Sequence, residues 1–90
     1  MKRLTVRVFG MVQGIGYRYT SQKEAKKSGF TGYARNGDDG SVEIVAEGSE
    51  ADLKNFIQWC YNDIGPAVVK KVETSWSEPT SEFNDFTIKP

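Results

Sequence analysis

The chain has 90 residues, enough for one domain with one modest core, because folding at this size buries roughly 60–70% of the surface of the unfolded chain. Its 12 basic and 12 acidic side chains give a net charge of zero, which argues against the broad basic surface of a nucleic-acid-binding protein. The absence of histidine and the single cysteine exclude an internal disulfide, a histidine-assisted nucleophile and a zinc site built from histidine and cysteine.

The N-terminal segment has the features of neither an export signal nor a membrane anchor. It begins MKRLTVRV, which is interrupted by charge, and no later segment approaches the length of an apolar membrane span. We therefore expect a cytoplasmic protein that makes no contact with membranes. Nothing in the sequence requires more than a monomer.

The first predicted element is a strand with one buried face. Apolar residues alternate along it at Leu4, Val6 and Val8, and Gly10 ends the pattern. The chain then turns through Gly14 and Gly16, where the lack of a Cβ lets successive backbone N–H groups point into one concavity that suits an anion.

A helical pattern begins near residue 18 or 20, so these amides are expected at a helix N-terminus with Arg18 at the rim. A planar guanidinium matches phosphate oxygens well. The same residues also fit a tight strand-to-helix turn with a solvated Arg18, and both interpretations stay open here. A dinucleotide fingerprint is excluded because its third glycine would fall at Tyr19, and no Gly-Lys-Ser/Thr follows to make a nucleotide P-loop.

The next elements are a helix and a β-hairpin. Thr20 or Ser21 is expected to cap the helix, which should stop at Gly29. Its thin apolar stripe consists of Tyr17, Ala25 and Phe30. Residues 31–36 and 41–47 are predicted strands around the turn 37–40. In the second strand, we expect Val42, Ile44 and Ala46 to be buried and the opposite face, with Glu43, Val45 and Glu47, to be acidic and hydrated.

A second helix begins at Ser49, carries apolar residues at helical spacing and is expected to end at Gly65-Pro66. These apolar residues are Leu53, Phe56, Ile57, Cys60 and Ile64. Strands are predicted at 69–76 and 83–89, separated by a turn at 78–81. The order β-α-β-β-α-β with a short extra C-terminal strand predicts an α+β, ferredoxin-like sandwich, in which two helices cover one face of an antiparallel sheet.

Few other residues suggest chemistry. Asn36 precedes the turn with an amide that both donates and accepts, although Asn-Gly is also a common turn dipeptide. No third ligand is spaced to join Asp38 and Asp39 around a metal. Cys60 lies in an apolar stripe and is expected to be an inert core residue.

Two glycine-containing segments together resemble the acylphosphatase family. They are GMVQGIGYR at 10–18 and GYARNGDDGSV at 32–42, followed by Gly48 and by an ending, DFTIK, similar to the last strand of that family. The resemblance covers almost the whole chain, 1–90, as a single acylphosphatase-like domain. Ile15 stands where valine is usual and Tyr17 where phenylalanine or methionine is usual, and both changes keep bulk and apolar character.

The resemblance implies a hydrolase that cleaves the carboxyl-phosphate anhydride of a small-molecule acyl phosphate to a carboxylate and inorganic phosphate. It implies in-line attack of water without metal or organic cofactor, and it assigns the catalytic roles to Arg18 and Asn36. Phosphate or sulfate is the anion expected to bind. The residues expected to bind it are Gly14, Ile15, Gly16, Tyr17 and Arg18.

The alternative is a non-catalytic module of the same fold that binds phosphate, another ligand or RNA. RNA readers of this architecture use stacking aromatics on an open sheet face. Here that face is expected to carry Glu43 and Glu47, which would repel a phosphate backbone.

Overall fold

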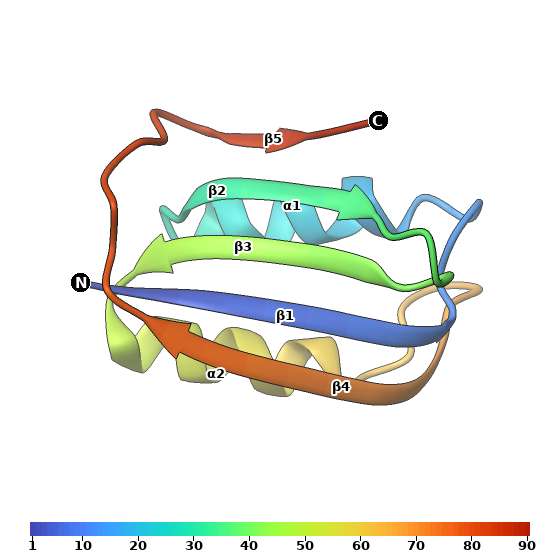
Figure 1. Cartoon of the computed structure of the whole chain (residues 1–90). Helices are drawn as coiled ribbons and strands as arrows, with labels where there is room; N and C mark the ends of the chain where they lie inside the picture. The colour runs from blue at the N-terminus through green and yellow to red at the C-terminus, as the bar shows by residue number, and fades with distance from the viewer.

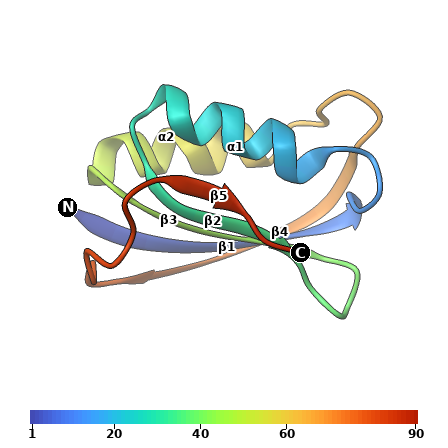
Figure 2. The same cartoon turned by 90° about the horizontal axis from the view of Figure 1, so that it is seen from above.

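A computed structural model describes all 90 residues as a five-stranded sheet with two helices against one face (Figures 1 and 2). The elements are β1 (Lys2–Met11), α1 (Tyr17–Lys27), β2 (Thr31–Asn36), β3 (Val42–Gly48), α2 (Glu50–Cys60), β4 (Val68–Ser77) and β5 (Phe86–Ile88). The strand order is β4-β1-β3-β2-β5. This confirms the ferredoxin-like arrangement, with the correction that β5 pairs with β2 in parallel and makes the sheet mixed. No helix is long and apolar enough to cross a membrane.

The core lies between the sheet and the two helices. The alternation predicted for the two central strands is confirmed, since the inward side chains are fully buried. These are Leu4, Val6 and Val8 of β1 and Val42, Ile44 and Ala46 of β3. The helices add Tyr17, Ala25, Leu53, Phe56 and Cys60. Burial of one valine, leucine or isoleucine side chain contributes about 1.5–3 kcal/mol, so this layer stabilises the packing of the helices on the sheet.

Gly10 does not end the first strand. β1 continues to Met11, and its pairing with β4 shifts register between Phe9 and Gly10. A Cβ at Gly10, whose φ is 137°, would lie 2.1 Å from the backbone oxygen of Val68. The glycine is therefore required by the close approach of β4, and the break in the alternating pattern marks a bulge instead of a strand end.

The second helix begins as predicted but ends earlier. Ser49 is the N-cap, and its hydroxyl accepts from the backbone N–H of Asp52 at 3.2 Å. The helix stops at Cys60, where the N–H of Tyr61 donates to the carbonyl of Gln58 in a tightened last turn. Ile64 packs against the core from the loop that follows α2. Its apolar spacing therefore made the predicted helix too long.

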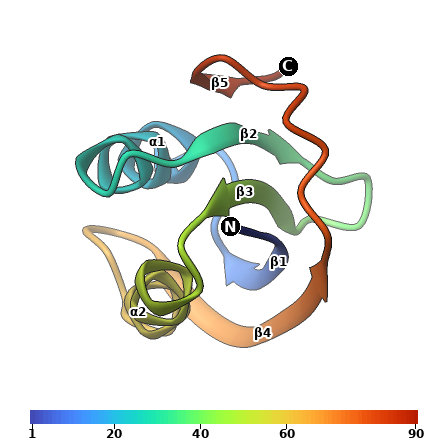
Figure 3. The same cartoon turned by 90° about the vertical axis from the view of Figure 1, so that its left-hand side faces the viewer.

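The outer face of β3 is covered, contrary to the expectation of a hydrated acidic face. Val45 is 3% exposed and Glu47 is 1% exposed. The segment between β4 and β5 returns over this side of the sheet, opposite the helices (Figure 3). Both carboxylate oxygens of Glu47 accept from it, at 2.8 Å from the N–H of Thr80 and 3.1 Å from that of Ser81. Burial of this carboxylate is possible because these donors, with Arg3 at 3.8 Å, replace water.

Cys60 is fully buried, as expected, and burial raises the pKa of its thiol to about 12. We expect iodoacetamide to leave the native protein unmodified at a pH of about 8.5, where an exposed thiol is about half ionised. A raised pKa keeps the reactive thiolate scarce below that value, and burial blocks access. Mass spectrometry should show one added group only after unfolding in urea. Modification of the native protein at the unfolded rate would contradict a closed core at this position.

Candidate active site

The loop of residues 12–16 joins β1 to α1 and takes its shape from two glycines. Gly14 has φ 78° and Gly16 has φ 82°, both in the left-handed region that side chains disfavour. A Cβ at either position would meet no atom within 4 Å. Unlike Gly10, these two glycines are therefore required by backbone conformation and not by crowding.

The first helix begins at Tyr17 with Gly16 as its N-cap, which corrects the expected capping by Thr20 or Ser21. The carbonyl of Gly16 accepts the first helical bond from the N–H of Thr20 at 3.0 Å. Both hydroxyls instead donate to carbonyls, that of Thr20 to Gly16 and that of Ser21 to Arg18. The spacing of Ser21 and Glu24 resembled a capping box because the helix starts one turn earlier than the pattern suggested.

The two helices differ at their N-termini. Ser49 caps α2, and its first turn carries Glu50 and Asp52. By contrast, α1 has neither a side-chain cap nor an acidic residue in its first turn. The free N–H groups and the positive end of the α1 dipole are therefore left without the protein's own negative charge, which is the arrangement of an anion site.

Arg18 differs from the other three arginines of the chain because it has no carboxylate partner. Its Nη1 donates to the backbone carbonyl of Lys89 at 2.7 Å, and it makes no ion pair. Each of the others has an acidic partner within 4 Å: Arg3 pairs with Glu47 and Glu82, Arg7 with Asp39 and Glu43, and Arg35 with Glu43. A guanidinium has five N–H donors, so Arg18 keeps most of its donors and its whole charge for a ligand.

Asn36 closes β2 and lines the same pocket as Arg18. Its side chain makes no hydrogen bond within the protein, so the amide is free on both its donor and acceptor sides. The pocket has a volume of about 240 Å³. Its lining residues are Val12, Gly14, Gly16, Tyr17, Arg18, Tyr19, Asn36 and Ile88. Folding thus brings the arginine and the asparagine of two separate motifs to one cavity.

Two residues of the predicted phosphate loop pack their side chains against the core, although Tyr17 also lines the pocket. Ile15 does not line the pocket, and its side chain packs against the core. Tyr17 is 2% exposed, and burial, followed by the neighbouring Cys60, raises the pKa of its phenol. Any contribution of these residues to anion binding would come from their backbone N–H groups.

The sequence did not predict that residues 88 and 89 contribute to this pocket. The carbonyl of Lys89 fixes Arg18, and Ile88 of β5 lines the cavity. These residues lie about as far from Arg18 in the chain as its length allows, and no local pattern signals such a contact. The parallel pairing of β5 with β2 brings them there, with Ile88 opposite Ala34.

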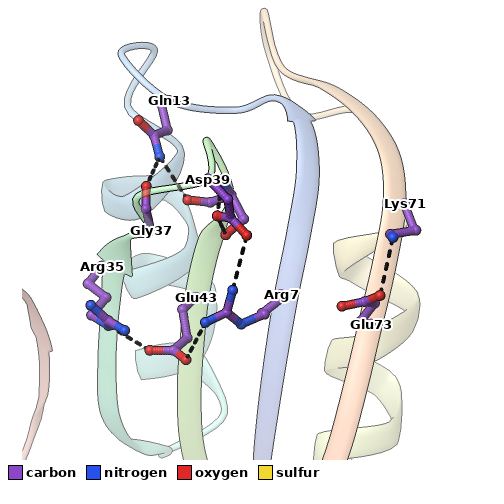
Figure 4. A network of polar contacts seen from close by, with 9 residues as sticks. Arg7, Gln13, Arg35, Gly37, Asp39, Glu43, Lys71 and Glu73 are labelled. Atoms are coloured by element: carbon purple, nitrogen blue, oxygen red, sulfur yellow. Dashed lines mark hydrogen bonds and ion pairs between the residues drawn. The ribbon is translucent and has the colours of Figure 1, made fainter.

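Polar contacts hold the turn that follows Asn36 (Figure 4). The carboxylate of Asp39 accepts from the N–H of Ser41 at 3.1 Å and from Arg7 at 3.2 Å. The bonds from Ser41, and then the charge of Arg7, lower the pKa of Asp39. Glu43 lies between Arg7, at 3.6 Å, and Arg35, at 2.6 Å. Arg7 thus ties the turn to β1, while Glu43 links the three strands β1, β2 and β3.

The sequence and the fold are both similar to those of known proteins. A sequence profile of the acylphosphatase family matches residues 4–88. An acylphosphatase of Paenarthrobacter aurescens is 44% identical over 86 residues, which are 96% of this chain and 92% of that protein. The crystal structure of an acylphosphatase from Bacillus subtilis superposes with a TM-score of 0.94 at 36% identity over all of both chains. One from Coxiella burnetii has a TM-score of 0.90 at 27% identity, covering 98% of this chain and 92% of that one. The chain therefore belongs to the acylphosphatase family.

Proposed function

We propose that this acyl phosphate hydrolase acts in the pocket between the 12–16 loop and Asn36, with Arg18 and Asn36 as catalytic residues. Family membership supports the activity. The observation that carries the assignment of the site is the free charge of Arg18 beside the uncapped N-terminus of α1, in one cavity with the unpaired amide of Asn36.

The phosphoryl group would bind to the backbone N–H groups of residues 14–18 and to the guanidinium of Arg18. An acyl phosphate carries a good leaving group, so the enzyme has mainly to hold the phosphoryl oxygens, balance their charge and align a water. Donors that are already in place at a helix N-terminus do this with little reorganisation. Phosphate or sulfate would occupy the same position, which makes inorganic phosphate a competitive inhibitor.

The attacking water would be oriented by Asn36, whose amide oxygen accepts a hydrogen bond from it. An amide is too weak a base to remove the proton, so the proton passes to a phosphoryl oxygen of the substrate. A bond forms between the water oxygen and phosphorus while the bond from phosphorus to the acyl oxygen breaks. An acyl phosphate dianion and water then give a carboxylate and dihydrogen phosphate, and both atoms and charge balance without a further reactant.

The RNA-binding alternative requires an open sheet face, and β3 does not provide one. The outer face of that strand is covered by the segment that contains Thr80 and Ser81. The net charge of zero also provides little attraction for a phosphate backbone. No contact in the molecule favours this alternative.

The purified protein is expected to hydrolyse benzoyl phosphate in the presence of excess chelator, and inorganic phosphate is expected to inhibit competitively. The decay of the ultraviolet absorbance of benzoyl phosphate measures the rate, with buffer alone as the reference. A rate equal to that in buffer would contradict the activity. Phosphate binding without hydrolysis would instead identify a non-catalytic anion-binding module. Loss of the rate on chelation would contradict the metal-free mechanism.

A further inference from the structure

One residue of the first motif has no role in the function described so far. The side chain of Gln13 leaves the loop and reaches the turn after Asn36 (Figure 4). Its Nε2 donates to the carbonyl of Gly37 and to that of Ser41, both at 2.9 Å. Because both partners are carbonyls, only the NH₂ side of the amide can make these bonds, and both of its hydrogens are used.

The two carbonyls are the ends of the turn. Gly37 follows Asn36 directly, and its N–H donates to the carbonyl of Ser41 at 2.8 Å. The Gln13 amide therefore joins the first and last residues of the turn, and the first of them, Gly37, is the neighbour of Asn36. A displacement of the turn relative to the loop would break both bonds at once.

The sheet does not hold the loop and the turn together at this point. Pairing between β1 and β3 ends at Val8 and Val42, and the last residues of β1 pair only with β4. No other hydrogen bond or ion pair joins residues 12–16 to residues 36–41. Gln13 thus makes the only direct polar contacts between residues 12–16 and residues 36–41.

We propose that Gln13 is a positioning residue for this hydrolysis, which holds Asn36 at a fixed distance from the phosphate loop. The inference rests on the proposed function, because it requires that the phosphoryl group bind to the loop and that Asn36 guide the water. In-line attack depends on the relative position of these two groups, and an error of about 1 Å can reduce a rate by about 10²-fold.

The test is the kinetics of Gln13→Ala with benzoyl phosphate. We expect kcat to fall by about 10- to 100-fold, because the water is misaligned. The inhibition constant of inorganic phosphate should stay within about threefold, since the loop and Arg18 bind phosphate without Asn36. Gln13→Glu, which keeps the length but has no donor, should be at least as slow. Gln13→Met, of similar length and also without donors, serves in place of the alanine variant if that variant melts near the assay temperature.

Two further variants separate positioning from general stability. Ser49→Ala removes one hydrogen bond at the start of α2, outside the pocket, and should melt earlier with an unchanged kcat. The double variant Gln13→Ala/Asn36→Ala should be about as slow as Asn36→Ala alone, because Gln13 acts through Asn36.

Three results would overturn the inference: a kcat of Gln13→Ala equal to that of the parent, additive losses in the double variant, or a loss confined to phosphate affinity. Failure of the proposed function gives a different result. In that case the parent does not hydrolyse benzoyl phosphate, or Asn36→Ala and Arg18→Ala are as fast as the parent.

Discussion

Replacing Arg18 with alanine is expected to lower kcat/KM for benzoyl phosphate by about 10³-fold and to abolish measurable inhibition by inorganic phosphate. Loss of one preorganised donor at a site of developing charge costs about 3–4 kcal/mol, and Arg18 supplies several donors and a full charge. The fold should stay intact, because Arg18 has no carboxylate partner that would be left unpaired. Initial rates, phosphate inhibition and a thermal melt measure the three parts of this expectation.

Two variants control this measurement. Arg18→Lys keeps the charge but loses the planar fork, so it should recover only part of the phosphate affinity. Arg35→Ala removes an arginine whose charge is already balanced by Glu43 at 2.6 Å, and its kcat/KM should change by less than about threefold. Unaltered phosphate inhibition in Arg18→Ala would exclude Arg18 from the site.

Arg18 has a long, flexible side chain that would lose conformational entropy on binding an anion, and its position in the structure reduces that loss. Its bond to the carbonyl of Lys89 holds the guanidinium before a ligand arrives. Uncharged backbone is a suitable partner, because a carboxylate in this place would neutralise the charge that the phosphoryl group needs. The side chain is thereby fixed without losing its electrostatic function.

The elements that the sequence predicted best are those with a strong local signal. Alternation identified the buried faces of β1 and β3, and the hydroxyl of Ser49 identified the start of α2. Two of the errors, at Gly10 and Glu47, share one cause, which is long-range contact. Gly10 of β1 is required by the close approach of β4. The acidic residue Glu47 is buried under a segment more than 30 residues further along the chain.

The candidate site divides in the same way. The motif residues Arg18 and Asn36 lie in one pocket, and their catalytic roles stay a prediction. The contact of Arg18 with Lys89 and the bridge from Gln13 to Ser41 depend on how β5 and the turn are placed in three dimensions. Neither has a spacing that sequence periodicity can reveal, because periodicity reports the face of an element and not its neighbours.

Asn36→Ala is expected to reduce kcat by about 10²- to 10³-fold while the inhibition constant of inorganic phosphate changes by less than about threefold. The amide of Asn36 has no partner in the protein, so its removal leaves no buried group unsatisfied and should cost little stability. Phosphate affinity should persist, because the loop amides and Arg18 are retained. Steady-state kinetics with benzoyl phosphate, and phosphate as inhibitor, separate the two quantities.

Asn36→Asp sharpens this test, because it keeps the size and the acceptor oxygen but replaces the NH₂ group with negative charge. If Asn36 faces the phosphoryl group, repulsion should raise the inhibition constant of phosphate in the aspartate variant and not in the alanine variant. Lower ionic strength should enlarge that difference, since the pocket is open to solvent and salt screens the repulsion. Equal turnover in Asn36→Ala and the parent would show that the attacking water needs no guide. Equal phosphate inhibition in both variants at low salt would place Asn36 away from the bound anion.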